Sequence, residues 1–331
     1  MTSVGPKLAD IRENYQSLKS KLIVTPVVKL NSMSELSRQL EGSDVYLKLE
    51  CFQHTGTFKA RGALTTVANT PDERLKSGIV AVSAGNHGAA TAFAASKQGY
   101  SSRVFMMQPA NPFRISLCKS LGAEITIVPA GAHPFKEAQR YIAGNGGFLM
   151  HPFEGPLIAL STGSLSLEFL EQVPDLEVLV VAIGGGGLAG GFSAAAKQIN
   201  PALKVYGVEP FGADSMFQSI KAAKPVAIEK VATIADSLGA PNAEPYSYSL
   251  CHAYLDDVVR VTDDQLCEGM YRLFVDQKLA VEPAGAAALA AIAGPLRDKV
   301  QGKKVGVVVC GANIDASSFC KFLVRGRELL Q

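Results

Sequence analysis

Residues 79 to 150 alternate between short apolar segments and longer segments with the composition of helices. Two of the helical segments end directly before a glycine, Gly99 and Gly122, which is a common way for a helix to stop. The strands expected in this block are residues 79–83, 103–107, 124–128 and 147–150. A strand, a helix and a second strand form a parallel pair, because the helix carries the chain back to the starting edge. The sequence therefore predicts an α/β fold.

The same alternation returns after a long helical segment at residues 157–172. The further strands expected are residues 24–28, 45–49, 178–183, 205–208, 258–261 and 305–309. They predict a second sheet, built from both ends of the chain. We therefore expect two α/β domains, with a smaller domain of residues 52–151 inserted into a larger one formed by residues 1–51 and 152–331.

The net charge limits which partners the protein can bind, and the cysteine content indicates the cellular compartment in which it works. The 331 residues carry a formal net charge of +2, which gives no basic surface for nucleic acid or membranes and favours a small-molecule substrate. Residues 178–196 are uncharged and about long enough to span a bilayer, but their six glycines favour a strand, a turn and a helix. The six cysteines form no CxxC pair and the N-terminal segment is charged, so we expect a cytoplasmic protein with reduced thiols.

A run of four glycines, Gly184 to Gly187, follows an apolar strand and precedes a helix. Backbone amides without side chains at a helix N-terminus bind anions, so this run predicts a phosphate site; a tight, closely packed turn is the simpler interpretation. Residues 185–190 also satisfy the GxGxxG pattern of dinucleotide-binding folds, and Glu209 lies at about the spacing of a ribose-binding acid. A nicotinamide cofactor would, however, leave Lys59 and residues 83–88 without a role.

Two polar segments lie where ligands bind in α/β folds. Residues 83–88 join a strand to a helix, so Ser83, Asn86 and free amides could hold a carboxylate, and Asn86 could also donate to a phenolic oxygen. Helix capping by Ser83 or Asn86 is the alternative, and a lone histidine such as His87 is more often packed or hydrogen-bonded than catalytic. Lys59 opens a predicted helix; it could form a Schiff base with a carbonyl cofactor or be a solvated lysine on an exposed helix.

Cys310 and a pair of acids are weaker candidates. Cys310 follows the last expected strand and could be a nucleophile, a buried apolar residue or a weak hydrogen-bond partner; no histidine lies near it in the sequence. Glu209 and Asp214 could supply oxygen ligands to a hard cation, or they could be solvated surface residues.

Together these segments resemble the serine/threonine dehydratases of the fold-type II enzymes that depend on pyridoxal 5'-phosphate (PLP), a family that also includes serine racemase. The resemblance covers nearly the whole chain. The segments that carry it are residues 55–63, 83–88, 151–153, 184–187, 208–210, 236–239, 282–285 and 310–313. It implies two parallel-type α/β domains, of which the larger binds PLP, and a homodimer.

The resemblance also implies a role for each candidate residue. Lys59 would be the Schiff-base lysine and the general base, Phe58 would pack against the cofactor ring, and Asn86 would donate to the phenolic oxygen of that ring. The phosphate would be held by the amides of Gly184, Gly185, Gly186 and Gly187. Cys310 would face the pyridine nitrogen, and the substrate carboxylate would be bordered by Ser83, Asn86 and His87.

The activity implied is a β-elimination that converts a 3-hydroxy amino acid, such as L-threonine or L-serine, to a 2-oxo acid and ammonia. Ala84 stands where the racemases of the family carry a second serine that delivers a proton, so we expect a dehydratase and not an efficient racemase. Glu209 and the carbonyl of Ala213 match the family's divalent-metal site, whereas Ser215 replaces a further acid, which argues against a tightly held metal. A divalent or monovalent cation at this site is the expectation that the resemblance leaves.

Several alternatives stay open at this stage. Residues 161–164 differ from the usual Gly-Gln-Gly-Thr, so a bulkier 3-hydroxy amino acid is an alternative substrate. Serine racemase and a cysteine-synthase-like β-replacement enzyme are alternatives within the same fold, although His87 departs from the substrate loop of the latter. A nicotinamide-dependent dehydrogenase and a non-catalytic ligand-binding protein are alternatives from other classes.

Overall fold

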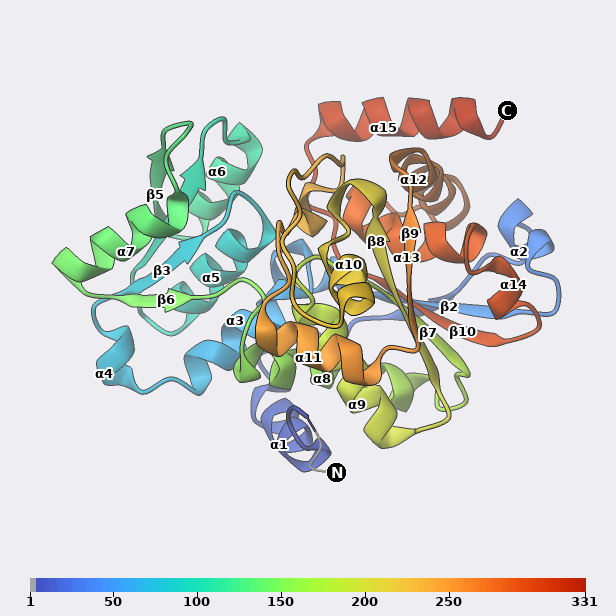
Figure 1. The fold of residues 1–331 in the computed structure, drawn as a ribbon, viewed down its shortest axis with the longest axis horizontal. Helices are drawn as coiled ribbons and strands as arrows, with labels where there is room; N and C mark the ends of the chain where they lie inside the picture. The colour runs from blue at the N-terminus through green and yellow to red at the C-terminus, as the bar shows by residue number, and fades with distance from the viewer. Residues whose placement is uncertain (1–3) are drawn as a thin grey trace.

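The computed structural model describes residues 4–331, and its smaller sheet has four strands (Figure 1). In spatial order these are β5 (Ala123–Val128), β4 (Ser102–Met107), β3 (Ile79–Val82) and β6 (Phe148–Met150). All neighbouring pairs are parallel. The strand–helix alternation of residues 79–150 therefore predicted both the sheet and its strand direction.

The larger sheet has six strands. In spatial order these are β1 (Val27–Lys29), β2 (Asp44–Leu49), β10 (Lys304–Val309), β7 (Val178–Ala182), β8 (Lys204–Pro210) and β9 (Asp257–Val261). Only the edge strand β1 runs antiparallel to its neighbour. The last strand in the sequence, β10, lies between β2 and β7, so both ends of the chain build this sheet.

The two sheets form two layers side by side, with the four-stranded sheet on the left in Figure 1. All strands of the smaller sheet lie within residues 79–150, and the strands of the larger sheet lie before and after that block. The predicted α/β fold with two parallel-type sheets is confirmed. The domain boundaries at residues 52 and 151 stay a prediction.

The smaller sheet is covered by helices on both faces. The helices of this layer are α4 (Asp72–Leu75), α5 (Asn86–Lys97), α6 (Pro112–Ser120) and α7 (Pro134–Asn145). One apolar cluster joins the sheet to α5 and α6, and a second joins it to α7. Every residue of β3 is buried, which explains why this strand is a continuous apolar run instead of an alternating one.

The helices outside the smaller layer are α1 (Leu8–Leu18), α2 (Glu35–Gln39), α3 (Lys59–Ala68), α8 (Pro156–Gln172), α9 (Gly187–Ile199), α10 (Ser215–Ala222), α11 (Pro245–Tyr254), α12 (Asp263–Gln277), α13 (Pro283–Ala293), α14 (Arg297–Val300) and α15 (Ala316–Leu329). Most of these helices surround one extended core, whereas α1 and α3 belong to a second apolar cluster shared with α5, α8 and β3. Four short 3-10 turns complete the chain: η1 (Glu50–Phe52), η2 (His54–Gly56), η3 (Phe211–Ala213) and η4 (Asp236–Leu238).

The uncharged segment 178–196 divides into the buried strand β7, a glycine turn and most of α9. Within residues 4–331, no helix combines the length and the apolar character needed to cross a membrane. The interpretation of this segment as strand, turn and helix is confirmed.

The helix α3 is held by a buried group of charged side chains. Arg61 is 0% exposed; its Nε and Nη2 donate to the two oxygens of Glu50 at 2.7 and 2.8 Å, and Nη2 also donates to Glu168 at 3.0 Å. Glu168 in turn accepts from Lys48 Nζ at 2.5 Å. Each charge therefore has an opposite partner and hydrogen bonds, which is what makes buried ionised groups tolerable. The group fixes the turn of α3 that directly follows Lys59.

The same group explains why the first strand is shorter than predicted. Strand β1 begins at Val27 instead of residue 24. The amide of Thr25 donates to Glu168, and its carbonyl accepts from Lys48. The backbone groups of Thr25 are therefore bonded to side chains and are not available to pair with a neighbouring strand.

Candidate active site

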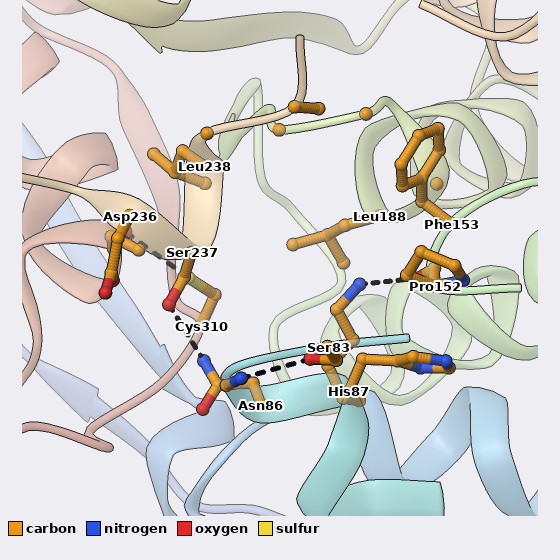
Figure 2. Close-up of a pocket in the computed structure, with 18 of the residues that line it drawn as sticks. Ser83, Asn86, His87, Pro152, Phe153, Leu188, Asp236, Ser237, Leu238 and Cys310 are labelled. Carbon is orange, nitrogen blue, oxygen red and sulfur yellow. Dashed lines mark hydrogen bonds between the residues drawn. The ribbon is translucent and has the colours of Figure 1, made fainter. Parts of the chain in front are cut away.

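A cavity of about 310 Å³ opens between the two layers (Figure 2). Strands β3, β7 and β10 all end at it, since Ser83, Gly184 and Cys310 line its wall. Parallel α/β folds bind ligands at this carboxyl edge. The predicted site residues that line the cavity are Phe58, Lys59, Ser83, Asn86, His87, Gly184, Gly185, Gly186, Gly187 and Cys310. Glu209 and Ala213 do not line it.

Lys59 lies at the first position of α3, with its amine inside the cavity. The start of this helix is tied to the end of β10, because the Phe58 amide and the Thr57 hydroxyl both donate to the Cys310 carbonyl at 3.1 Å. The Lys59 Nζ donates to the carbonyl of Pro152 at 2.5 Å. Since residues 60–67 of α3 are all buried, the alternative of a solvated lysine on an exposed helix is wrong.

The surroundings of Lys59 make its amine easier to deprotonate. Burial lowers the pKa of Lys59 to about 8, and the nearby Cys310 and Glu282 only partly oppose this. The ring of Phe58 lies 5.1 Å from Nζ and adds to the apolar wall. A lysine with a lowered pKa spends more time as the neutral amine, which is the nucleophilic and basic form.

The four glycines form a closely packed turn before α9. Gly186 has φ +91°, a conformation that side chains disfavour. A Cβ on Gly185 would collide with the ring of Phe153. Within residues 4–331, the amides of Gly184, Gly185 and Gly186 donate to no other residue, and the first amides of α9 are free by helix geometry. The turn is thus both tightly packed and rich in free donors, which suits a phosphate.

Asn86 connects the loop of residues 83–88 to the larger layer. Its Nδ2 donates to Glu282 at 2.6 Å and to Ser237 at 3.2 Å, and its Oδ1 accepts from Asn313 at 2.7 Å. Figure 2 shows Asn86, Ser237 and Cys310 at one end of the cavity and Pro152 and Phe153 at the other. The side chain of Asn86 therefore does not cap its helix, whereas the Ser83 hydroxyl oxygen does accept a local bond from the Gly85 amide.

His87 is held as a neutral ring. Its Nε2 lies 2.8 Å from the Met150 carbonyl, so Nε2 carries the proton and donates. Burial, followed by the charge of Lys59, lowers the pKa of His87 to about 3. The structure thus matches the interpretation of a packed, hydrogen-bonded histidine, with one side on the cavity.

Cys310 is a buried thiol whose Sγ lies 3.3 Å from the Ala284 carbonyl. Burial raises the pKa of Cys310, and Glu282 adds to the increase. A neutral thiol is a poor nucleophile, so the structure favours the hydrogen-bonding role for this cysteine over the nucleophilic one.

Three further residues of the cavity wall had no assigned role in the sequence. Glu282 is 2% exposed and accepts from Asn86 and from Ser237; burial raises its pKa to about 7, although these bonds oppose the increase. Its position directly before the uncharged helix α13 was the available signal, since an acid at a helix start is a common cap. Arg114 and Asp236 form an ion pair across the cavity mouth. Asp236 begins one of the segments that carry the family resemblance, whereas no local pattern marks Arg114.

The acids at 209 and 214 are buried, so their interpretation as solvated surface residues is wrong. Glu209 is 0% exposed and accepts from the amides of Met216 and Phe217 at 2.9 and 2.7 Å, which caps α10. Burial raises the pKa of Glu209 to about 8. Asp214 pairs with Arg260 at 2.9 Å. In the described part of the chain, no three His, Cys, Asp or Glu residues cluster as metal ligands would. A cation at Glu209 and Ala213 stays a prediction.

Comparison with known proteins decides the family. The family model described as pyridoxal-phosphate dependent enzyme matches residues 19–311. The chain belongs to this family. Phenylserine dehydratase of Ralstonia pickettii is 41% identical over 325 residues, covering 98% of both chains. L-threonine ammonia-lyase of Thermotoga maritima is 33% identical over 320 residues, covering 96% of this chain and 78% of that protein. The structure of maize serine racemase matches with a TM-score of 0.90 and 31% identity, covering 99% of both chains.

These similarities confirm a PLP-dependent enzyme of the lyase type with the fold-type II architecture. The nicotinamide alternative also loses its ribose-binding acid, since both oxygens of Glu209 are engaged by α10. The homodimer, the cytoplasmic location and the individual site roles stay predictions.

The residues of the cavity fit PLP. The free amides of the glycine turn suit its phosphate, the Lys59 amine suits its aldehyde, and Cys310 offers a neutral partner to its ring nitrogen. Asn86 supplies an amide donor on the same wall, although in this structure that donor binds Glu282.

Proposed function

We propose that this protein is a PLP-dependent dehydratase that converts a 3-hydroxy amino acid, such as L-threonine or L-serine, to a 2-oxo acid and ammonia. The observation that carries the proposal is the Lys59 amine, which is half-buried, has a pKa lowered to about 8 and shares one cavity with the glycine turn and the loop of residues 83–88.

The proposed base is the Nζ of Lys59, which removes the proton from Cα of the bound amino acid. Its lowered pKa lies close to neutral pH, where a general base works best. PLP, when bound, supplies the electron sink that stabilises the negative charge developing at Cα. Phe58, Pro152 and Phe153 line the same cavity as Lys59 and give it an apolar wall.

The substrate carboxylate is proposed to lie on the loop of residues 83–88, at the N-terminus of α5, where amides and the partial positive charge of the helix favour an anion. Loss of the C3 hydroxyl releases one water, and hydrolysis of the resulting product consumes one. The sum is one 3-hydroxy amino acid converted to one 2-oxo acid and one ammonium ion.

Cys310 supports elimination over other reactions of the same cofactor class. A neutral thiol cannot keep a pyridine nitrogen protonated as a carboxylate does, so the electron sink stays weak. A weak sink favours prompt loss of a leaving group from C3.

A bulkier substrate is a second candidate. One wall of the cavity is formed by residues 238–241, Leu-Gly-Ala-Pro, which carry no charge and two of the smallest side chains. A relative with 41% identity is a phenylserine dehydratase. An amino acid with an aromatic group on C3 would bury that group against this apolar wall.

Racemisation is expected to be slow. Ala84 lines the cavity and its methyl group has no proton to donate, whereas proton delivery to the opposite face of Cα requires an acidic group there. The relatives that are named serine racemases, at 32 to 33% identity, therefore do not fix the activity of this chain.

A substrate panel tests the proposal. The purified holoenzyme is incubated with L-serine, L-threonine and L-threo-phenylserine, and both ammonia and 2-oxo acid are measured. We expect equal amounts of the two products and none from Lys59→Ala. Borohydride reduction followed by peptide mapping should place the cofactor on Lys59. A Lys59→Ala enzyme that deaminates at the wild-type rate would refute the proposal.

A further inference from the structure

The mouth of the cavity is crossed by an ion pair between the two layers. Arg114 lies on α6 of the smaller layer, and Asp236 begins η4 of the larger one. The guanidinium Nη1 and Nη2 donate to the two carboxylate oxygens of Asp236 at 2.5 and 2.9 Å. Nη1 also lies 3.4 Å from the carbonyl of Ala84, on the loop proposed to hold the substrate carboxylate. Both residues line the cavity.

Arg114 is a largely buried cation beside the reacting region. Its side chain is 14% exposed, whereas that of Asp236 is 56% exposed. Burial lowers the pKa of Arg114, because it disfavours the charged form. The hydrogen bond to Asp236 and the charges of Asp236, Glu282 and Asp315 raise this pKa by more, so the net change is an increase. Among these acids Asp236 is the one in direct contact with the guanidinium, since Glu282 is bonded to Asn86 and Ser237.

The position of the substrate's C3 group follows from the rest of the cavity. The glycine turn, Phe58 and Cys310 are proposed to hold the cofactor, and residues 83–88 to hold the carboxylate. The wall that is left includes residues 238–241 and, at its edge, the ion pair. We expect a group on C3 to face this wall, where a long or charged one would come close to Arg114.

We propose that Asp236 sets the charge preference at C3: by neutralising Arg114, it makes the cavity favour an uncharged C3 group over a C3 carboxylate. This inference rests on the proposed dehydratase function and adds the substrate class. In the wild type, the Arg114 guanidinium is already paired with the Asp236 carboxylate, so a second carboxylate on the substrate would gain little from it. Without Asp236, the same guanidinium is a buried cation that needs an anion, and a C3 carboxylate supplies one.

The test compares Asp236→Asn with the wild-type holoenzyme on two substrates, L-threonine and L-threo-3-hydroxyaspartate. Asparagine keeps the shape of the side chain and removes its charge. We expect the ratio of kcat/KM for hydroxyaspartate to kcat/KM for threonine to increase by about tenfold or more. Adding Arg114→Gln to Asp236→Asn should abolish the increase. The matched control is Asp175→Asn, which removes the partner of exposed Lys304 on the larger layer and should leave the ratio unchanged.

Different results separate this inference from the function on which it rests. If the wild type deaminates threonine and the ratio in Asp236→Asn stays within twofold of the wild-type ratio, the inference is wrong and the function stands. If Arg114→Gln alone lowers kcat/KM for both substrates by the same factor, Arg114 binds the carboxylate that they share, and the inference is again wrong. If the wild type deaminates neither substrate nor phenylserine, the proposed function fails and the inference with it.

Discussion

The glycine turn offers a sharp test of the cofactor site. In Gly185→Ala, the added Cβ would overlap three ring atoms of Phe153. The backbone of Gly185 is outside the left-handed region, so the effect is purely steric. The ring has little freedom to move, because its edge packs on His151 with the ring centroids 4.8 Å apart. We therefore expect the backbone of the glycine turn to shift, so that its amides no longer point together toward the phosphate.

The magnitude follows from the bonds at risk. A hydrogen bond from an amide to a charged phosphate is worth about 1.5–3 kcal/mol. Loss of two such bonds costs about 3–6 kcal/mol of binding free energy. Since about 1.4 kcal/mol corresponds to a factor of ten, the dissociation constant of PLP should increase by about a hundredfold or more.

The assay is a titration of the cofactor-free protein with PLP, followed by its absorbance. The matched control is Gly144→Ala, because no atom lies within 4 Å of a Cβ at that helical position. We expect wild-type affinity for the control and partial rescue of Gly185→Ala by Phe153→Ala, which removes the obstructing ring. A dissociation constant for Gly185→Ala within threefold of the wild-type value, in a protein with unchanged circular dichroism, would refute this account of the turn.

Three other outcomes are expected. Arg61→Met leaves Glu50 and Glu168 as buried acids without their arginine. It should lower the free energy of unfolding of the holoenzyme, measured by chemical denaturation, by about 3–5 kcal/mol. The control Arg140→Ala removes an exposed ion pair and should change this free energy little. The rate at which the cofactor-free protein binds PLP should increase with pH up to about 8 and then level off, because only the neutral Lys59 amine attacks; a flat profile between pH 6 and 8 would contradict the lowered pKa. Ala84→Ser should increase racemisation of L-serine, measured by chiral chromatography, and an unchanged rate would count against the proposed role of this position.

Sequence patterns predicted the strands and the cavity wall because both depend on local chemistry. Apolar runs such as residues 79–82 become buried parallel strands, and the polar or glycine residues that follow them necessarily gather at one edge of a sheet. Ser83, Gly184 and Cys310 were therefore identifiable before the structure, since each follows a strand.

Residues whose environment depends on distant partners were not predictable in this way. Arg114 and Asp236 are 122 positions apart in the sequence, and nothing near either one indicates the other. Glu209 and Glu168 resemble ordinary surface acids in the sequence, but the fold buries both and supplies their partners from other elements. Side-chain burial of this kind is decided by tertiary packing, which local composition does not encode.

The central position of β10 has a consequence for how the chain is made. On the ribosome, residues 79–150 emerge early and contain every strand of the four-stranded sheet. Strands β2 and β7 emerge early as well, but each must wait for β10, the last strand to be synthesised, before its edge is paired. We therefore expect nascent chains that stop just short of residue 304 to expose two unpaired β edges and to depend on chaperones, even though they already contain every strand except β10.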